Sequence, residues 1–330
     1  MPPERLIELS NRYGGSAEYV LAGGGNTSYK DESFLYVKRS GAALADITAE
    51  GFVQLDRVKL SRVFSAAYPE EPQAREAAVL RDMLAARCAG EEDKRPSVEA
   101  LLHHLMPFAY ALHIHPARAN GLTCGQNGEV AMRALFPGEA VWIPQTMPGY
   151  VLAKEARQRI LKHGKPPRLL FLENHGVFVG GDTAEDVDAA VAEMDSALAR
   201  VIGQTPDFDQ ELAKALSSRE AFARVRTTFT PDHMVYCGKE ALFVESAEEL
   251  ARHRDFPGII GLKDTGIYGG GKNQKETDTA AALFLDALKI SVYAESFGGA
   301  KPMEPWLVDA IGSWEAERFR KGVNSDGTQV

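Results

Sequence analysis

Hydrophobic and polar positions alternate along this chain with two different periods. Apolar residues three or four positions apart predict helices over 3–13, 55–67, 71–87, 98–106, 127–135, 150–163 and 182–202. Short apolar runs bounded by turn residues predict strands at 34–38, 106–115, 140–143, 168–172 and 177–179. Strands interleaved with helices place this part of the chain in a layered α/β (α+β) class.

A polar stretch at 203–207 interrupts this pattern and predicts a domain boundary. The expected division is a first domain over 1–205 and an α/β extension over 206–330. In the extension we predict short strands near 233–244, helices at 275–296 and 304–320, and a frayed end near 324–327.

Two serine or threonine positions mark expected helix starts. Ser97 is predicted to cap the helix that begins at Val98, and Thr183 lies in a segment with the spacing of a capping box before the long helix to 202.

Composition narrows the class of protein. Of the 330 residues, 45% are hydrophobic and 25% are charged, as in ordinary globular proteins. The net charge of −9 disfavours nucleic acid or an anionic membrane as the main partner. The three cysteines form no Cys-x-x-Cys pair, which suits a reducing compartment, and no apolar stretch approaches 18 residues. We therefore expect a cytoplasmic protein without a membrane segment.

The most informative chemistry is the pair His113 and His115 at the end of the apolar run 106–115. Residues at i and i+2 of a strand share a face and lie about 6.6 Å apart, so two imidazoles there reach one metal ion. With 8 histidines in 330 positions, about 0.2 such pairs arise by chance. The pair therefore needs a third ligand and a base to carry a hypothesis.

His175 is the candidate third ligand, since it lies between two predicted strands beside Gly176, which permits close backbone approach. An ordinary turn histidine is the alternative. Glu99, in the first turn of the helix after Ser97, is the candidate base, although a helix dipole also favours a carboxylate there. His103 shares a helix face with Glu99 and is expected to be packed or hydrogen-bonded.

Several segments offer possible phosphate donors. The turn Gly23-Gly24-Gly25-Asn26-Thr27-Ser28 presents backbone N–H groups, but it matches neither the dinucleotide pattern nor the P-loop, and a plain tight turn explains it equally. Gly269-Gly270-Gly271-Lys272 is treated as a loop for the same reason. The remaining candidates are Ser40, Gly41, Lys38 and Ser97, the last at an expected helix N-terminus.

Taken in order, these pieces resemble the metal-dependent class II aldolase/adducin family. The matching segments are Gly25-Asn26-Thr27-Ser28, Ser40-Gly41, Pro96-Ser97-Val98-Glu99 with His103, His113-Ile114-His115-Pro116, and Glu173-Asn174-His175-Gly176. The spacing and the extension look most like the aldolase part of bifunctional rhamnulose-1-phosphate aldolase/lactaldehyde dehydrogenase proteins, with no dehydrogenase domain within these residues.

The resemblance implies a three-layer αβα catalytic domain and a zinc-dependent aldolase, with Mn²⁺ or Co²⁺ as other possible ions. It implies His113, His115 and His175 as metal ligands and Glu99 as the catalytic acid/base. Asn26, Ser40, Gly41 and Ser97 would hold the phosphate of a small sugar phosphate. The implied reaction cleaves a ketose 1-phosphate of the rhamnulose or fuculose type to dihydroxyacetone phosphate and an aldehyde. A homo-oligomer, tetramer or dimer, is also implied.

One position departs from the family. Small family aldolases often carry a tyrosine acid after a proline in the strand that follows the helix near 127–135, and here the stretch reads Trp142-Ile143-Pro144-Gln145. Gln145 takes that place, so the proton donor is unassigned. Two alternatives remain open: an epimerase or dehydratase on the same metal site, and a metal-free adducin-like binding module, which would be expected to lack the ligand histidines.

Overall fold

A seven-stranded mixed sheet organises the first two thirds of the chain in the computed structural model, which describes residues 1–271 and 273–314. Its strand order is β3-β2-β1-β4-β7-β6-β5. All neighbours are antiparallel except β5 and β6. The strands are β1 (Asn26–Lys30), β2 (Phe34–Lys38), β3 (Phe52–Asp56), β4 (Tyr110–Ile114), β5 (Ala140–Ile143), β6 (Leu169–Leu172) and β7 (Gly176–Gly181).

Helices cover both faces of this sheet, because successive strand residues point to opposite sides. Leu112 and Ile114 of β4 join one apolar layer, whereas Ala111 joins the other. The first layer is closed by α1 (Glu4–Gly14), α5 (Ala117–Thr123), α6 (Gly128–Leu135) and α8 (Ala184–Ile202). The second is closed by α2 (Arg57–Val63), α3 (Pro72–Ala85), α4 (Ala100–Leu105) and α7 (Tyr150–His163). The predicted αβα layering is confirmed.

A smaller sheet, of order β10-β9-β8, lies in the C-terminal segment, by which we mean the described residues from 206 onward. It comprises β8 (Leu242–Val244), β9 (Ile259–Leu262) and β10 (Gly266–Gly269). The helices of the segment are α9 (Phe208–Ala215), α10 (Arg219–Phe222), α11 (Pro231–Cys237), α12 (Ala247–Arg252), α13 (Gln274–Ala294) and α14 (Pro305–Ser313). The 3₁₀ turns of the chain are η1 (Ala49–Gly51) and η2 (Glu295–Phe297).

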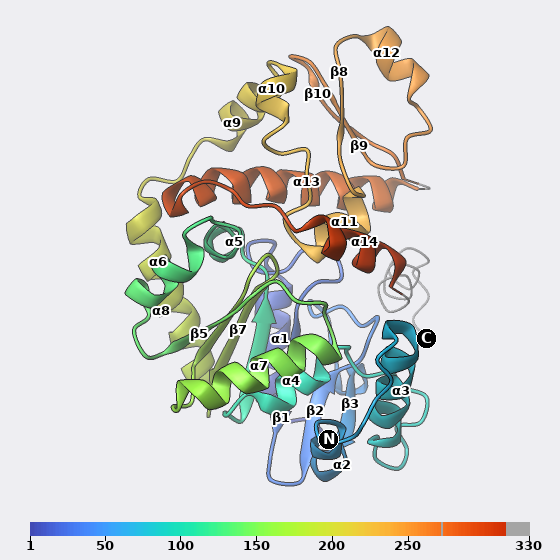
Figure 1. Cartoon of the computed structure of the whole chain (residues 1–330), viewed down its shortest axis with the longest axis vertical. Helices are drawn as coiled ribbons and strands as arrows, with labels where there is room; N and C mark the ends of the chain where they lie inside the picture. The colour runs from blue at the N-terminus through green and yellow to red at the C-terminus, as the bar shows by residue number, and fades with distance from the viewer. Residues whose placement is uncertain (272, 315–330) are drawn as a thin grey trace.

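Helix α13 joins the two parts. Figure 1 shows it crossing the middle of the molecule, with the small sheet on one side and the large sheet on the other. It packs against α5 of the first part and against α11, β9 and β10 of the C-terminal segment. Within the described residues, no helix is long and apolar enough to cross a membrane.

Most predicted elements occur where they were expected. The helices at 127–135, 150–163 and 275–296 agree with α6, α7 and α13 to within two residues, and the strand at 140–143 agrees with β5. The capping box before α8 is present, since the Thr183 hydroxyl accepts from the Asp186 N–H and the Asp186 carboxylate accepts from the Thr183 N–H.

Two predicted starts were wrong in the first part. The strand predicted from 106 begins only at Tyr110, where pairing with β1 and β7 starts; Pro107, which lacks an N–H donor, lies in the bent stretch before it. The helix predicted at 55–67 begins at Arg57, because residues up to Asp56 pair with β2 and the Asp56 side chain caps the helix at the Lys59 N–H.

Three other predictions also need correction. Residues 26–28, expected in a turn, open strand β1. Short strands were expected near 233–244, but residues 233–237 belong to α11, because Thr230 caps the His233 N–H and Pro231 occupies the first turn; only β8 at Leu242–Val244 is strand there. The predicted helix at 304–320 is α14 over Pro305–Ser313, and Trp314 after it is extended; residues 315–320, the end near 324–327 and Lys272 lie outside the described residues.

Candidate metal centre and substrate pocket

Three histidines converge at the ends of β4 and β7. His113 belongs to β4 and His115 follows its last residue, so the two share a face as the strand period predicts. His175 lies in the turn between β6 and β7. One ring nitrogen of each lies within 4.8 Å of the others, which makes this a group that could hold a metal ion.

Hydrogen bonds fix the tautomers of two of these rings. Nδ1 of His113 lies 3.1 Å from the Val177 carbonyl oxygen, which can only accept, so that nitrogen carries the proton. Nδ1 of His115 lies 2.6 Å from Oδ2 of Asp232 and donates to this carboxylate. In the neutral rings both Nε2 atoms then present lone pairs, and they face each other at 2.9 Å. Two facing lone pairs repel, and a bound cation removes that repulsion, so the residues fit a metal.

Burial keeps the third ring neutral as well. The pKa of His175 is lowered to about 3, chiefly by burial, and the nearby imidazoles lower it further while Glu99 opposes them. A neutral imidazole is the form that binds a metal ion. Gly176 is required beside it, because a Cβ there would lie 2.5 Å from Cδ2 of His115.

Glu99 faces the histidines from the N-cap of α4. The carboxylate is buried, with Oε2 accepting from the Asn26 amide at 2.7 Å and lying 3.4 Å from Nε2 of His113. Its other oxygen, Oε1, lies 3.6 Å from Nε2 of His175 and has no hydrogen-bond partner within the described residues. A buried carboxylate oxygen without a partner is costly unless a ligand, a proton or an ion satisfies it.

A chain of buried polar groups holds Glu99 in place. Asn26 donates to Glu99 through Nδ2 and accepts from Nε2 of His103 through Oδ1, and Nδ1 of His103 accepts from the Ser28 hydroxyl at 2.7 Å. Burial lowers the pKa of His103 well below its usual range, so the ring is neutral. His103 is thus a hydrogen-bonded helix residue, as expected. The Asn26 amide is engaged with these neighbours rather than directed at the Lys38 end of the pocket described below.

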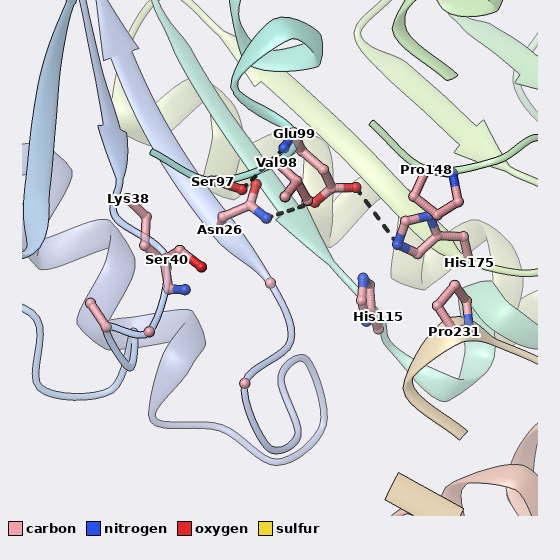
Figure 2. A pocket seen from close by; sticks show the side chains of 14 residues that line it. Asn26, Lys38, Ser40, Ser97, Val98, Glu99, His115, Pro148, His175 and Pro231 are labelled. Atoms are coloured by element: carbon pink, nitrogen blue, oxygen red, sulfur yellow. Dashed lines mark hydrogen bonds and ion pairs between the residues drawn. The ribbon is translucent and has the colours of Figure 1, made fainter. Parts of the chain in front are cut away.

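A pocket extends from the histidines across the ends of the strands (Figure 2). At one end lie His115 and His175 with Pro148 and Pro231; at the other lie Lys38 and Ser40. The wall residues are Gly23, Gly25, Asn26, Lys38, Ser40, Gly41, Ala42, Ser97, Val98, Glu99, His115, Pro148, His175 and Pro231. The site residues that the family resemblance implies all line this pocket except His113, which adjoins it through His115 and Glu99.

The end opposite the histidines offers groups suited to an anion. Lys38 is a buried cation in the wall, and Gly41 has a φ of +86°, which gives the backbone after Ser40 a shape that glycine favours. Ser97 is not the helix cap that was predicted: its hydroxyl accepts from the Glu99 N–H at 3.2 Å, and α4 begins at Ala100. The reason is a hydrogen-bonded turn from the Ser97 carbonyl to the Ala100 N–H, which precedes the helix.

Gln145 is a structural residue in this arrangement. Its Nε2 donates to Asn174, and its Oε1 accepts from the Glu304 N–H at 2.8 Å. Tyr150 is packed in the apolar layer and edge-on to Tyr68, outside the pocket wall. The proton donor is therefore still unassigned. Gly269 and Gly270 lie in the small sheet and its following loop, away from this pocket.

Asp232, Pro231 and Pro148 lie at the site and were not predicted from the sequence. The Thr230-Pro231-Asp232 order is a helix-start signal that would have placed Asp232 in a first turn. Gly24, in the turn that was open between phosphate binding and a plain tight turn, leaves room for the His115–Asp232 contact, since a Cβ there would lie 3.0 Å from Oδ2 of Asp232.

This sheet, with histidines gathered at its strand ends, defines a class II aldolase-type domain. The model of the Class II Aldolase and Adducin N-terminal domain matches residues 4–202, and the chain belongs to this family. It is 28% identical over 193 residues to "Uncharacterized oxidoreductase YuxG" of Bacillus subtilis. That match covers 55% of this chain and 27% of the relative, so the chain spans only about a quarter of that protein.

A solved structure shows the same fold. The N-terminal class II aldolase domain of a conserved protein from Thermoplasma acidophilum has a TM-score of 0.52 at 24% identity and covers 60% of this chain and 92% of its own. The L-fuculose-1-phosphate aldolase from Thermus thermophilus is a more distant match, with a TM-score of 0.39 at 16% identity, covering 60% of this chain and 94% of its own.

Proposed function

We propose that this chain is a zinc-dependent aldolase that cleaves a phosphorylated ketose of the rhamnulose or fuculose 1-phosphate type. The observation that carries the proposal is the convergence of three imidazoles on one point, beside a buried carboxylate oxygen that has no hydrogen-bond partner among the described residues. Three protein ligands with an open position are typical of a catalytic zinc site, and imidazole also suits Mn²⁺ or Co²⁺.

His113, His115 and His175 would hold the ion. When bound there, it supplies Lewis-acid polarisation of the substrate's carbonyl and hydroxyl oxygens. The hydrogen bonds to the Val177 carbonyl and to Asp232 direct the Nε2 lone pairs of His113 and His115 into the centre.

Glu99 would move the proton of the reaction. Its Oε1 takes the proton from the C4 hydroxyl as the C3–C4 bond breaks, which releases the aldehyde and leaves the bonding electrons on the three-carbon fragment. Proton return to C3 of that fragment completes dihydroxyacetone phosphate. The hydrogen bond from the Asn26 side-chain amide to Oε2 keeps Oε1 directed at the pocket. General acid–base catalysis of this kind contributes about 10²–10⁴-fold.

The opposite end of the pocket would hold the phosphate. Lys38 supplies a positive charge, and Ser40, Gly41 and Ser97 supply hydroxyl and backbone donors along one wall. For Asn26 we propose only that it lines the wall near the phosphate, because its side-chain amide already donates to Glu99. We also propose a homo-oligomer, which light scattering on the purified protein tests.

A product assay tests the reaction. Purified protein with its bound metal quantified is offered rhamnulose 1-phosphate and fuculose 1-phosphate, and dihydroxyacetone phosphate is followed with a coupled reductase. The unphosphorylated sugars are the matched controls, and we expect them to react more slowly because the Lys38 end of the pocket stays unused. A panel that yields no dihydroxyacetone phosphate from metal-loaded protein contradicts the aldolase assignment. No bound divalent ion contradicts the metal centre itself.

A further inference from the structure

We propose that Asp232, which lies outside the family domain, is a positioning residue for His115, so that the C-terminal segment completes the metal centre. The inference rests on the proposed metal site. The family model ends at residue 202, and Asp232 lies in α11 of the C-terminal segment. Its contact with His115 joins residues 117 positions apart in the chain.

The contact is short, buried and charge-assisted. Asp232 is 4% exposed, and its Oδ2 lies 2.6 Å from Nδ1 of His115. Burying a carboxylate is costly unless a strong donor compensates it, and the Nδ1–H group is such a donor. Its proton stays on Nδ1, so the Nε2 lone pair is the one directed at the metal site. Outer carboxylates of this type fix the ring orientation and raise the basicity of metal-binding histidines.

The element that carries Asp232 is held firmly. Thr230 caps α11 at the His233 N–H, and α11 packs against both α13 and α14. Helix α13 in turn packs on α5, which starts at Ala117, two residues after His115. Asp232 and His115 are therefore both held by elements that pack against α13.

The segment supports the turn of a second ligand as well. Asn174, immediately before His175, has a φ of +57° and is buried. Its Nδ2 donates to the carbonyl oxygens of Phe229 at 3.0 Å and Lys301 at 2.7 Å. Lys301 also forms an ion pair with Glu173 at 2.8 Å. Thus Phe229, Asp232 and Lys301 of the C-terminal segment support the positions of His115 and His175.

The test is the affinity of metal-free protein for Zn²⁺, measured by competition with a chromogenic chelator. We expect Asp232→Ala to weaken Zn²⁺ binding about 10–100-fold, the usual cost of an outer-shell partner, and Asp232→Asn to weaken it less because its amide oxygen still accepts. Substitution with Co²⁺ gives a second readout, in which the visible absorption bands of Asp232→Asn shift because the neutral amide no longer raises the basicity of the His115 ring.

The matched control is Asp286→Asn. Asp286 is also a buried carboxylate of the C-terminal segment facing a histidine, with Oδ2 at 3.2 Å from Nε2 of His233, and it lies outside the pocket. We expect the Zn²⁺ affinity of the Asp286→Asn variant to stay at the wild-type value. Thermal unfolding of the metal-free variants identifies any that fail to fold. If Asp232→Ala fails to fold, the Co²⁺ spectrum of Asp232→Asn tests the positioning role instead.

The outcomes separate the two proposals. If His115→Ala loses Zn²⁺ while both Asp232 variants keep the wild-type affinity and Co²⁺ spectrum, the positioning role is wrong and the metal centre stands. If wild-type protein binds no Zn²⁺, the metal centre is wrong, and the role of Asp232 falls with it. Equal weakening in Asp286→Asn would also overturn the specific role of Asp232.

Discussion

The first part of the chain and the C-terminal segment contribute to the same centre in different ways. The large sheet supplies the groups that would meet metal and substrate: two histidines at the end of β4, one in the β6–β7 turn, and Glu99 before α4. The segment supplies hydrogen-bond acceptors to these residues and their neighbours. Asp232 accepts from His115, and two backbone carbonyls accept from Asn174, the residue before His175. The proposed ligands thus come from the first part, whereas the segment helps to orient one of them, His115, and to hold the turn before another, His175.

Buried histidines inside the centre also differ from those outside it, in either region. His103 and His233 have hydrogen-bond partners on both ring nitrogens, Asn26 and Ser28 for one, the Phe229 N–H and Asp286 for the other. In the centre, Nε2 of His113 and Nε2 of His115 face each other instead. Saturated hydrogen bonding marks a histidine that stabilises the fold, and converging lone pairs mark one that binds a ligand.

The largest effect on turnover and metal binding should come from removing a histidine of the centre. We expect His175→Ala to abolish turnover, because only two of the three imidazoles remain to bind the metal. Metal affinity should fall by more than the factor of about 10–100 that loss of an outer-shell partner costs. His233→Ala is the matched control and should keep the metal while losing stability. Metal content after dialysis against chelator measures both. A His175→Ala protein that retains a full equivalent of metal would contradict the ligand role.

Glu99→Gln should separate chemistry from metal binding. The glutamine amide oxygen still accepts from Asn26, but it cannot take a proton, so we expect turnover to fall about 10²–10⁴-fold with metal content unchanged. Glu76→Gln, at a half-buried glutamate of α3 outside the pocket, should leave turnover near wild type. Turnover and metal content are measured on the same samples. Unchanged turnover in Glu99→Gln would make the carboxylate structural.

Asn174→Ala tests how firmly the segment holds the first part. The change leaves the Phe229 and Lys301 carbonyls without their donor and places alanine at positive φ, so we expect a loss of about 2–4 kcal/mol in unfolding free energy. Asp264→Ala is the control, because Asp264 has a similar φ of +52° but is exposed in the β9–β10 turn. It should cost about 1 kcal/mol. Urea unfolding compares them, and equal losses would show that backbone strain alone matters.

The smallest effect concerns His104 on α4. Burial lowers its pKa to about 4, below the ordinary value of 6.5. Between these values the unfolded chain binds a proton that the folded chain does not, so stability is highest above pH 6.5 and falls as the pH drops toward 4. His104→Gln should flatten that fall by at most about 2 kcal/mol, since the ring is partly exposed. Urea unfolding at pH 7 and pH 4.5 measures it; parallel curves would contradict the prediction.

Local sequence determined the layered α/β (α+β) class, the long helices with the capping segment of the last, and the shared face of His113 and His115. These follow from periods of two and 3.6 residues and from capping groups, which operate within a few positions. The ordered motifs also brought Glu99, His175, Ser40, Gly41 and Ser97 to one pocket, as the resemblance implied.

Only the tertiary structure decided what surrounds those residues. Strand β1 was not predicted, because Asn26, Thr27 and Ser28 are polar residues turned toward buried hydrogen bonds, with Ser10 for Thr27 and His103 for Ser28. Asp232 was not predicted either, because its partner lies 117 residues away and no local period encodes that pairing. Periodicity assigns a side chain to a face, whereas the partner it meets there depends on how distant elements pack.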